Sequence, residues 1–365
     1  MEQTLGHVTH GQNLRDAIAR QTTIEASWIP IPFEVSGPGR YVPAYANNWS
    51  VRASYRARRG LSEVLATWQH DVLFFHTQVT SLFSVRLMRR LPAVVSLDAT
   101  PINFDSVGAA YGHSAAGHTW LDARKSSMNR ASFQAARALV TWSEWAAASL
   151  VADYGIDSAK ISVIAPGAAR AFFAIGAERQ ASTTSGGVVR LLFVGGDFQR
   201  KGGADLLGAF AAARADGKAE LHIVTRDAVA SRPGVFVHRG IRPNSTELLD
   251  LIRQSDIFVL PSRGECLSIA LMEATAAGMA VISTNVGALG EAAVDGQNAH
   301  VVVPGDPRGL RSAIASLVED KALRTRFGRA GHALARQRFD AERNNQAILD
   351  ILASVARPMV ARSVA

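Results

Sequence analysis

Short apolar runs alternate with amphipathic stretches along most of the chain. In the first half the apolar runs are TIEASWIPIPF, DVLFFH, AVVSLD, ALVTWS and KISVIAP, and helical periodicity falls at residues 51–68, 81–90 and 122–136. Apolar strands that alternate with helices are typical of a parallel sheet covered on both faces. We therefore expect an α/β domain. No strand precedes its opening pattern, LGHVTHGQNLRDAI, so we expect that the true start lies upstream or that the first strand is missing.

The same alternation restarts after GAERQASTTSGGVVR, residues 176–190, which is small, polar and glycine-rich like a linker. The predicted strands that follow are RLLFVGG, AELHIVT, VFVHRG, DIFVLPS, MAVIST and AHVVVPG. Helices are expected to start at Ala204, Ser245 and Ser268, with a short one near Leu289. Two α/β units in tandem predict a cleft between them, and ligands of open α/β sheets bind at the carboxyl ends of the strands.

We predict three parts of the chain. Residues 1–178 form an N-terminal domain, residues 187–340 form a C-terminal domain, and residues 341–365 form a helical segment that crosses back to the first domain. Composition fits this division, because 365 residues with 48% hydrophobic and 19% charged residues are too many for one compact core.

The composition also indicates the cellular compartment in which the protein works. No apolar run approaches the ~20 residues of a membrane span, and the polar first residues do not resemble a signal peptide. The chain has one cysteine, Cys266, which excludes a disulfide framework and indicates a reducing compartment. We therefore expect a cytoplasmic protein.

The formal net charge is +8, and arginine dominates the basic residues, as in RASYRARRG and RLMRRL. Such a charge favours phosphorylated substrates, an acidic membrane surface or nucleic acid. Aromatic residues are not interleaved with the basic ones as a single-strand platform requires, so we do not expect nucleic acid. A solvated helix face is the simpler interpretation of the arginines, and peripheral contact with the inner face of the cell membrane is the alternative.

The stretch SRGECLSIALMEATAAGMAVIS, residues 262–283, keeps two glutamates among small and apolar residues. Its first residues follow a predicted strand, Ser268 can cap the next helix, and Gly278 can end that helix in the left-handed conformation. Glu265 then lies in the ligand-facing loop and Glu273 well inside the helix. A buried carboxylate needs hydrogen-bond donors, and a ribose diol supplies two parallel ones.

The predicted helix N-terminus between the glutamates offers free N–H groups and a positive dipole end to a phosphate. Together these groups suit one extended ligand: a hydroxylated group, a phosphate and a ribose, as in a nucleotide-sugar. The glutamate spacing alone is weak evidence for a ligand, because a capping carboxylate at Glu265 and a solvated helix residue at Glu273 explain it better. The flanking pattern, PS-x-x-E followed by E-A-x-A-x-G-x-x-V-I-S-T, favours the ligand.

At these residues the chain resembles glycosyltransferase family 4, the retaining nucleotide-sugar enzymes of the GT-B fold. RLLFVGGDFQRKGGADLLGAF looks like that family's donor-phosphate segment, and the region from SDIFVLPS to VVVPGD matches its glutamate motif nearly end to end. TWSEWAAASLVADYGIDSAKISVIAPGA resembles its passage from first domain to linker. The resemblance implies two Rossmann-like parallel-sheet domains facing across a cleft, the first binding the acceptor and the second the nucleotide-sugar.

The resemblance also implies roles for individual residues. Glu265 binds hydroxyls of the transferred sugar, Glu273 binds the ribose, and Lys201 contacts the diphosphate. Because a departing diphosphate gains negative charge, a fixed cation there lowers the barrier. Gly196 stands where the family usually has an arginine, and Arg200 is the expected replacement. The remaining donor-side candidates are Gly195, Gly196, Ser268, Cys266, Leu267 and Gly287, with Cys266 expected to be a buried, inert thiol.

Candidates for the acceptor side lie near strand ends of the first half. Relatives carry a histidine at the end of the third strand, where this chain has Asp98, which orients a hydroxyl or caps a turn. The other candidates are Gly6 and His7, with His10, in the glycine-containing first loop, His76 at the end of DVLFFH, and His113 after AAYG. No histidine spacing matches a zinc site and no Asp-x-Asp motif occurs, so we expect no metal and no cofactor besides the donor substrate.

We therefore predict a retaining glycosyltransferase of polysaccharide biosynthesis that moves a hexose from a nucleoside diphosphate sugar to a glycan or a lipid-linked saccharide. Retention follows from the resemblance, because no nucleophile is evident. One alternative is a sugar-nucleotide epimerase of the same fold. Another is a catalytically degenerate nucleotide-sugar-binding protein, which Gly196, Asp98 and the missing first strand favour. We set aside a nicotinamide dehydrogenase, because this chain has no Gly-x-Gly-x-x-Gly turn after a first strand.

Overall fold

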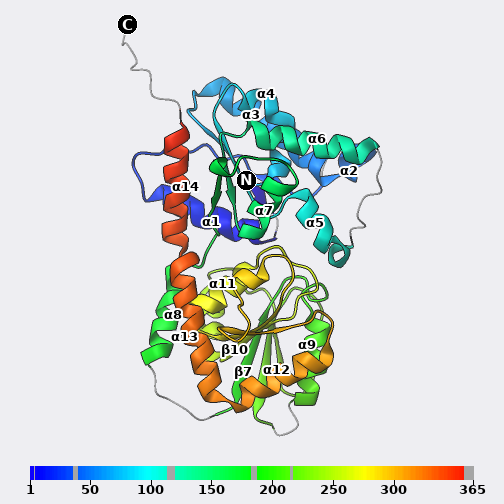
Figure 1. Ribbon diagram of the computed structural model, residues 1–365, viewed down its shortest axis with the longest axis vertical. Helices are drawn as coiled ribbons and strands as arrows, with labels where there is room; N and C mark the ends of the chain where they lie inside the picture. Colours follow the sequence, from blue (N-terminus) through cyan, green and yellow to red (C-terminus); the bar gives the residue numbers. More distant parts are fainter. Residues whose placement is uncertain (4, 36–39, 113–119, 182–186, 214–216, 357–365) are drawn as a thin grey trace. The chain divides into compact units, whose positions relative to one another are not determined.

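The computed structural model describes all residues except 4, 36–39, 113–119, 182–186, 214–216 and 357–365 (Figure 1). The chain divides into two compact units, which are described separately. Unit 1 comprises Met1–Ile102, Ala116–Ile164 and Arg343–Ala365, and unit 2 comprises Asn103–Ala115 and Ala165–Glu342. Among the helices of the described residues, none is both long enough and apolar enough to cross a bilayer.

Unit 2 is built on a parallel sheet whose strands are the predicted apolar runs. These strands are β7 (Val189–Val194), β8 (Ala219–Val224), β9 (Val235–His238), β10 (Ile257–Leu260), β11 (Ala280–Thr284) and β12 (Ala299–Val302). Their spatial order is β12-β11-β10-β7-β8-β9, and all neighbours pair in parallel. Every residue of β10 and β11 is buried, as expected of strands covered on both faces.

Helices cover both faces of this sheet. They are α8 (Arg170–Ala181), α9 (Gly203–Ala213), α10 (Thr246–Gln254), α11 (Ile269–Ala276), η6 (Leu289–Glu291), α12 (Pro307–Glu319) and α13 (Lys321–Arg338). Helix α12 packs against α9, whereas α11 packs against α13 and α8 (Figure 1). The predicted start of α11 is confirmed, because the Ser268 side chain accepts from the Leu271 amide, and Gly278 ends the turn at φ 68°.

The strand order creates a topological switch point in unit 2. Chain order runs outward from β7 to β9 on one side and from β10 to β12 on the other. The connections that follow β7 and β10 therefore lead to opposite faces of the sheet and open a crevice at the carboxyl ends of these two neighbours. This crevice is where an open α/β sheet binds its ligand.

Unit 1 also contains a parallel sheet, with the order β3 (Leu73–Phe75), β4 (Ala93–Leu97), β5 (Ala138–Thr141) and β6 (Ile161–Val163). Strand β1 (Glu2–Gln3) pairs separately with β2 (Ile31–Pro32). The helices of unit 1 are α1 (Leu5–Ala19), α2 (Pro43–Ala46), α3 (Trp49–Thr67), η2 (Gln78–Thr80), η3 (Leu82–Ser84), α4 (Val85–Met88), α6 (Trp120–Ala135), α7 (Glu144–Ala152), η5 (Ser158–Lys160) and α14 (Ala341–Val355). Helix α5 (Pro101–Val107) begins at the end of unit 1 and continues into unit 2, to which η4 (Gly108–Tyr111) also belongs.

The last helix belongs to the core of unit 1. Ile348 and Leu349 of α14 pack in one buried cluster with Leu14, Val94 and Val140. The C-terminal helix therefore covers a face of the unit 1 sheet together with α1, although almost the whole of unit 2 separates them in the sequence.

The structure corrects several local expectations in the first half. A short strand, β1, does precede the opening helix, and His7 and His10 lie in α1 rather than in a loop. The run TIEASWIPIPF contributes to a strand only at Ile31–Pro32. Residues 81–90 form the short helical turns η3 and α4 instead of one helix, and serine hydroxyls there bond to nearby backbone, as Ser81 Oγ does to the Gln78 carbonyl.

Two further expectations were wrong for reasons of packing. The predicted linker starts as helix, since α8 continues to Ala181. A Cβ at Gly176 would lie 2.4 Å from the Ala276 carbonyl oxygen, so this glycine serves close helix packing and not flexibility. Arg52 is not part of a solvated face, because it is 4% exposed and donates to the Phe33, Tyr45 and Ala46 carbonyls.

Candidate functional site

The loops that follow β7 and β10 are bound to each other at the switch point. The Arg263 amide donates to the Arg200 carbonyl at 2.9 Å, and the Ser262 hydroxyl donates to the same oxygen at 3.4 Å. Gly202 has φ 76°, and a Cβ on it would lie 2.0 Å from the Pro261 carbonyl oxygen. Only glycine allows this approach, which brings the two loops side by side.

This approach places a lysine and a glutamate in contact. Lys201 Nζ lies 2.8 Å from Glu265 Oε2, and Arg200 Nη1 lies 3.5 Å from the same oxygen. Glu265 is 8% exposed. Burial by itself raises the pKa of Glu265, but the charges of Lys201 and Arg200 outweigh it and hold the pKa below its usual value. The carboxylate is therefore ionised at neutral pH.

The Arg200 side chain is held in place by hydrogen bonds to three neighbouring residues. Its Nη1 donates to the Gly264 carbonyl at 2.6 Å and to the Tyr111 hydroxyl at 3.2 Å, and its Nε donates to Asp197 at 3.1 Å. The guanidinium also lies 4.3 Å from the centre of the Tyr111 ring. Because one of these contacts is to the Gly264 carbonyl, Arg200 positions the loop that carries Glu265.

A third cation near these loops, Arg226, was missed by sequence reasoning. Arg226 lies two residues beyond β8, and its Nη2 and Nε lie 3.0 and 3.1 Å from where a Cβ on Gly196 would stand. Among the described residues no carboxylate forms an ion pair with Arg226, and its side chain is exposed. The small residue at Gly196 thus leaves room for an arginine from the neighbouring strand. The only signal in the sequence was that Arg226 comes just after a predicted strand. Its position beside Gly196 depends on the order of the strands in the sheet, which the sequence does not reveal.

Glu273 has the opposite electrostatic character from Glu265. It lies in α11 and is 5% exposed, and within the described chain its carboxyl group has no hydrogen-bond partner. Burial raises its pKa to about 8, against the opposing charge of Lys201. Glu273 is therefore mostly protonated at neutral pH, and it lacks the donors that would favour its ionised form.

The remaining donor-side candidates surround the same loop. A Cβ on Gly195 would lie 2.6 Å from Lys201 Cδ, and one on Gly287, at φ 56°, would lie 1.9 Å from the Glu265 carbonyl oxygen. Cys266 and Leu267 are buried, and Ser268 caps α11. The structure thus gathers Lys201, Arg200, Glu265, Gly195, Gly196, Gly287, Cys266, Leu267 and Ser268 around the ends of β7 and β10.

Unit 1 has a separate cluster at the carboxyl ends of its strands. The rings of His10 and His76 stack at 4.9 Å, and the His7 ring lies 4.8 Å from that of Trp142. Burial, then the charge of His7, lowers the pKa of His10 to about 3, and burial also holds the pKa of His76 well below its usual value. His7 Nε2 lies 3.6 Å from Asp98 Oδ2. His10 and His76 are therefore neutral. Burial alone would raise the pKa of Asp98, but the neighbouring His7 outweighs it and holds this pKa below its usual value, so Asp98 is the ionised carboxylate of the cluster.

The other acceptor-side candidates are less informative. Gly6 lies in α1 and is half-buried, and His113 lies outside the described residues. No group of three or more histidine, cysteine or acidic side chains among the described residues is arranged to hold a metal ion.

Two family profiles match consecutive regions of the chain. The glycosyl transferase 4-like domain matches residues 12–167, and glycosyl transferases group 1 matches residues 189–320. Glycogen synthase of Mycobacterium tuberculosis is 38% identical over 110 residues, which cover 30% of this chain and 26% of that protein. D-inositol 3-phosphate glycosyltransferase 2 of Catenulispora acidiphila is 31% identical over 216 residues, which cover 53% of this chain and 51% of that protein. The chain thus spans about a quarter to a half of the length of these relatives.

Solved structures share the fold over most of the chain. Sucrose-phosphate synthase from Thermosynechococcus elongatus superposes with a TM-score of 0.70 at 17% identity, covering 97% of this chain and 94% of that one. HepE from Anabaena, in complex with UDP and glucose, superposes with a TM-score of 0.59 at 16% identity, covering 89% and 85%. These likenesses establish the fold alone, and they confirm the predicted pair of Rossmann-like, parallel-sheet domains.

Proposed function

The chain belongs to glycosyltransferase family 4 and has the GT-B fold, and from this premise we propose that it transfers a hexose from a nucleoside diphosphate sugar to an acceptor hydroxyl with retention of configuration. The observation that carries the proposal is the Lys201–Glu265 contact at the switch point of unit 2. An ionised carboxylate can accept hydrogen bonds from sugar hydroxyls, and the adjacent ammonium group can neutralise a diphosphate.

In this proposal the donor lies along the loops after β7 and β10. Glu265 accepts from hydroxyls of the hexose, and Glu273 accepts from the ribose diol. Lys201 has three N–H donors, so it can hold Glu265 and still reach the diphosphate. Arg226 supplies the second positive charge toward the diphosphate, in place of the arginine that Gly196 replaces.

The reaction exchanges one bond at the anomeric carbon for another. The bond between that carbon and the diphosphate oxygen breaks, and the electron pair leaves with the diphosphate. The acceptor oxygen bonds to the same face of the carbon, and its proton passes to the departing phosphate oxygen. Lys201 and Arg226 stabilise the negative charge that develops, which is the main contribution the protein makes.

The identity of the substrates is proposed from relatives. HepE was solved with UDP and glucose, so UDP-glucose is the first donor to test. Two relatives are named glycogen synthase and D-inositol 3-phosphate glycosyltransferase, which supports a hydroxyl-bearing carbohydrate acceptor. We assign acceptor recognition to unit 1, with the His7–Asp98 pair as its polar contact, and no cofactor besides the donor. A lipid-linked acceptor would bring the protein to a membrane surface.

A panel of nucleoside diphosphate hexoses tests the proposal, with release of the nucleoside diphosphate and transfer to glycan acceptors as readouts. Turnover is expected with at least one donor and should be lost in Glu265→Ala and Lys201→Ala. Interconversion of the donor sugar without acceptor would identify an epimerase instead. Tight binding of donors without any turnover would identify the catalytically degenerate binding protein.

A further inference from the structure

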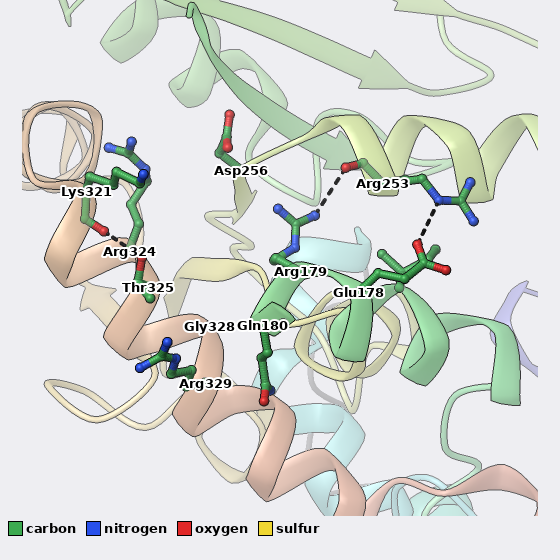
Figure 2. Close-up of a pocket in the computed structure, with 12 residues that line it drawn as sticks. Glu178, Arg179, Gln180, Arg253, Asp256, Lys321, Arg324, Thr325, Gly328 and Arg329 are labelled. Atoms are coloured by element: carbon green, nitrogen blue, oxygen red, sulfur yellow. Dashed lines mark hydrogen bonds and ion pairs between the residues drawn. The ribbon is translucent and has the colours of Figure 1, made fainter. Parts of the chain in front are cut away.

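A polar cavity of about 380 Å³ lies at the amino edge of the unit 2 sheet, whereas Lys201 and Glu265 lie at the carboxyl edge. Its volume is in the range of small-molecule sites. Its walls come from the end of α8, the residues just before β10 and the amino-terminal half of α13 (Figure 2). The cationic residues that line it are Arg179, Arg253, Lys321, Arg324 and Arg329.

One of these cations is neutralised locally. Arg253 Nε lies 3.3 Å from Glu178 Oε2, and Arg253 Nη1 lies 2.8 Å from Asp250 Oδ1. Figure 2 shows the Arg253 side chain directed toward Glu178. Among the described residues Asp256 is the one remaining lining carboxylate, and Arg179, Arg324 and Arg329 are the other lining arginines, so the arginines alone exceed it by two positive charges, three minus one.

Two of the arginines are fixed in position by helix ends. Arg179 donates from Nε to the Ala277 carbonyl at 3.1 Å and from Nη2 to the Ile252 carbonyl at 2.9 Å. Arg324 Nη1 donates to the Val318 carbonyl at 2.9 Å. These carbonyls belong to the C-terminal ends of α11, α10 and α12, whose negative dipole ends favour a cation nearby.

These contacts leave donors available. Among the described residues, Arg179 Nη1 and Arg324 Nε and Nη2 have no hydrogen-bond partner. Among the described residues Asp256 forms no hydrogen bond with either arginine, and its Oδ2 accepts instead from the Arg190 amide at 2.9 Å. Burial lowers the pKa of both arginines, although Asp256 attracts Arg179, and Asp256 and Asp320 attract Arg324. The nearby carboxylates therefore do not compensate fully for the burial of the two cations.

Glycines keep this region free of side chains. A Cβ on Gly328 of α13 would lie 2.2 Å from the Gly278 carbonyl oxygen, so α13 lies directly against the end of α11. Both glycines line the cavity. Backbone atoms of these two glycines therefore form part of the cavity wall beside the cationic side chains.

We propose that this cavity binds a small phosphorylated molecule that carries at least two negative charges, at a site separate from the donor nucleotide. An excess of two positive charges favours an anion that carries at least two negative charges, since a single carboxylate would balance only one of them. Arginine guanidinium groups match the oxygens of a phosphate in geometry as well as charge. Such a ligand would link α8 to α13 and stabilise unit 2 against unfolding.

The test is calorimetric titration of the full-length chain with inorganic pyrophosphate, in the Lys201→Ala background, which weakens the diphosphate contact of the donor site. Pyrophosphate is expected to bind, and Arg329→Gln should weaken its binding about fivefold, the upper range for an exposed charge pair. Asp256→Asn should strengthen it about as much, because it removes the opposing charge and keeps an oxygen for the Arg190 amide. Arg326→Gln is the matched control, since Arg326 is exposed on the same helix and does not line the cavity.

The opposite signs of the two variants separate binding from misfolding, because a damaged fold does not strengthen a ligand. The proposal is overturned if pyrophosphate does not bind in the Lys201→Ala background. It is also overturned if Arg329→Gln and Asp256→Asn bind pyrophosphate as the Arg326→Gln control does. These outcomes leave the proposed transfer reaction unaffected, since none of the three substituted residues belongs to the donor site.

Discussion

Lys201 Nζ lies 2.8 Å from Glu265 Oε2, and the two residues come from loops that follow neighbouring strands of unit 2. The contact keeps a buried carboxylate ionised and places a cation beside it. This arrangement explains how a largely apolar segment can retain an acidic residue, because the charge of Glu265 is balanced within the site.

Removing either partner of this contact should abolish most activity. Lys201→Met is expected to lower kcat about 100- to 1000-fold, the usual effect of losing one group that stabilises developing charge. Glu265→Gln should also lower kcat, because it replaces the charged acceptor for the hexose hydroxyls with a neutral one. Lys201→Met should also raise the pKa of Glu265, because its main counter-charge is gone. Steady-state kinetics with the active donor checks this, and Lys218→Met, an exposed lysine at the start of β8, is the control. Full activity in Lys201→Met would contradict the assignment.

Nucleotide binding should release protons near neutral pH. Free Glu273 has a pKa of about 8 and is mostly protonated at pH 7, and two hydrogen bonds from a ribose diol would favour its ionised form and lower that pKa. The binding enthalpy of the nucleoside diphosphate should therefore vary with the ionisation enthalpy of the buffer. Glu273→Gln should remove this dependence. A buffer-independent enthalpy for the native chain would argue against Glu273 as the ribose ligand.

Glu273 should also make the folded chain less stable in alkaline solution. Its pKa is raised from 4.5 to about 8 on folding, so its contribution to stability is fully present below pH ~4.5 and is lost as pH rises through ~8. Glu273→Gln cannot ionise, so its Tm should fall less than that of the native chain between pH 6 and pH 9. Parallel Tm curves for the two proteins would contradict this prediction.

Arg226 should contribute to catalysis through its charge. Arg226→Gln is expected to lower kcat/KM about tenfold or more, because one charge-assisted contact to the diphosphate is lost. Arg226→Lys should recover part of the loss, since it keeps the charge but not the planar fork. Arg239→Gln, an exposed arginine just after β9, is the matched control. Equal kcat/KM values for Arg226→Gln and this control would exclude the role.

The approach of the two loops should depend on Gly202. Gly202→Ala introduces a Cβ 2.0 Å from the Pro261 carbonyl oxygen, so it should lower Tm and activity together. Gly217→Ala is the control, because Gly217 also has a positive φ but nothing within 4 Å of the added Cβ. The control should lose only the ~1–2 kcal/mol of a left-handed non-glycine residue. Similar Tm losses in the two variants would show that the close approach has no effect.

The local elements of unit 2 were predictable because their signals are local. Apolar runs indicated β7 to β12, the Ser268 cap and the Gly278 turn bounded α11, and the residues around Lys201 and Glu265 carried the resemblance to the family. The secondary structure of unit 1 was harder to predict. Its serine-rich segment after β3 breaks into short turns whose serine hydroxyls bond to nearby backbone, and Gly176 looked like a linker residue although it serves helix packing.

For unit 2 the sequence by itself determined which segments become strands and helices, which loops carry Lys201 and Glu265, and which helix carries Glu273, because periodicity, capping and turn residues act over a few positions. Only the tertiary structure decided which groups meet. Strand order sets Arg226 against Gly196, α1 brings His7 to Asp98, and α8 and α13 enclose the cationic cavity around Asp256. These contacts join residues far apart in the chain, and they arise from the pairing of strands and the packing of helices, which no local pattern specifies.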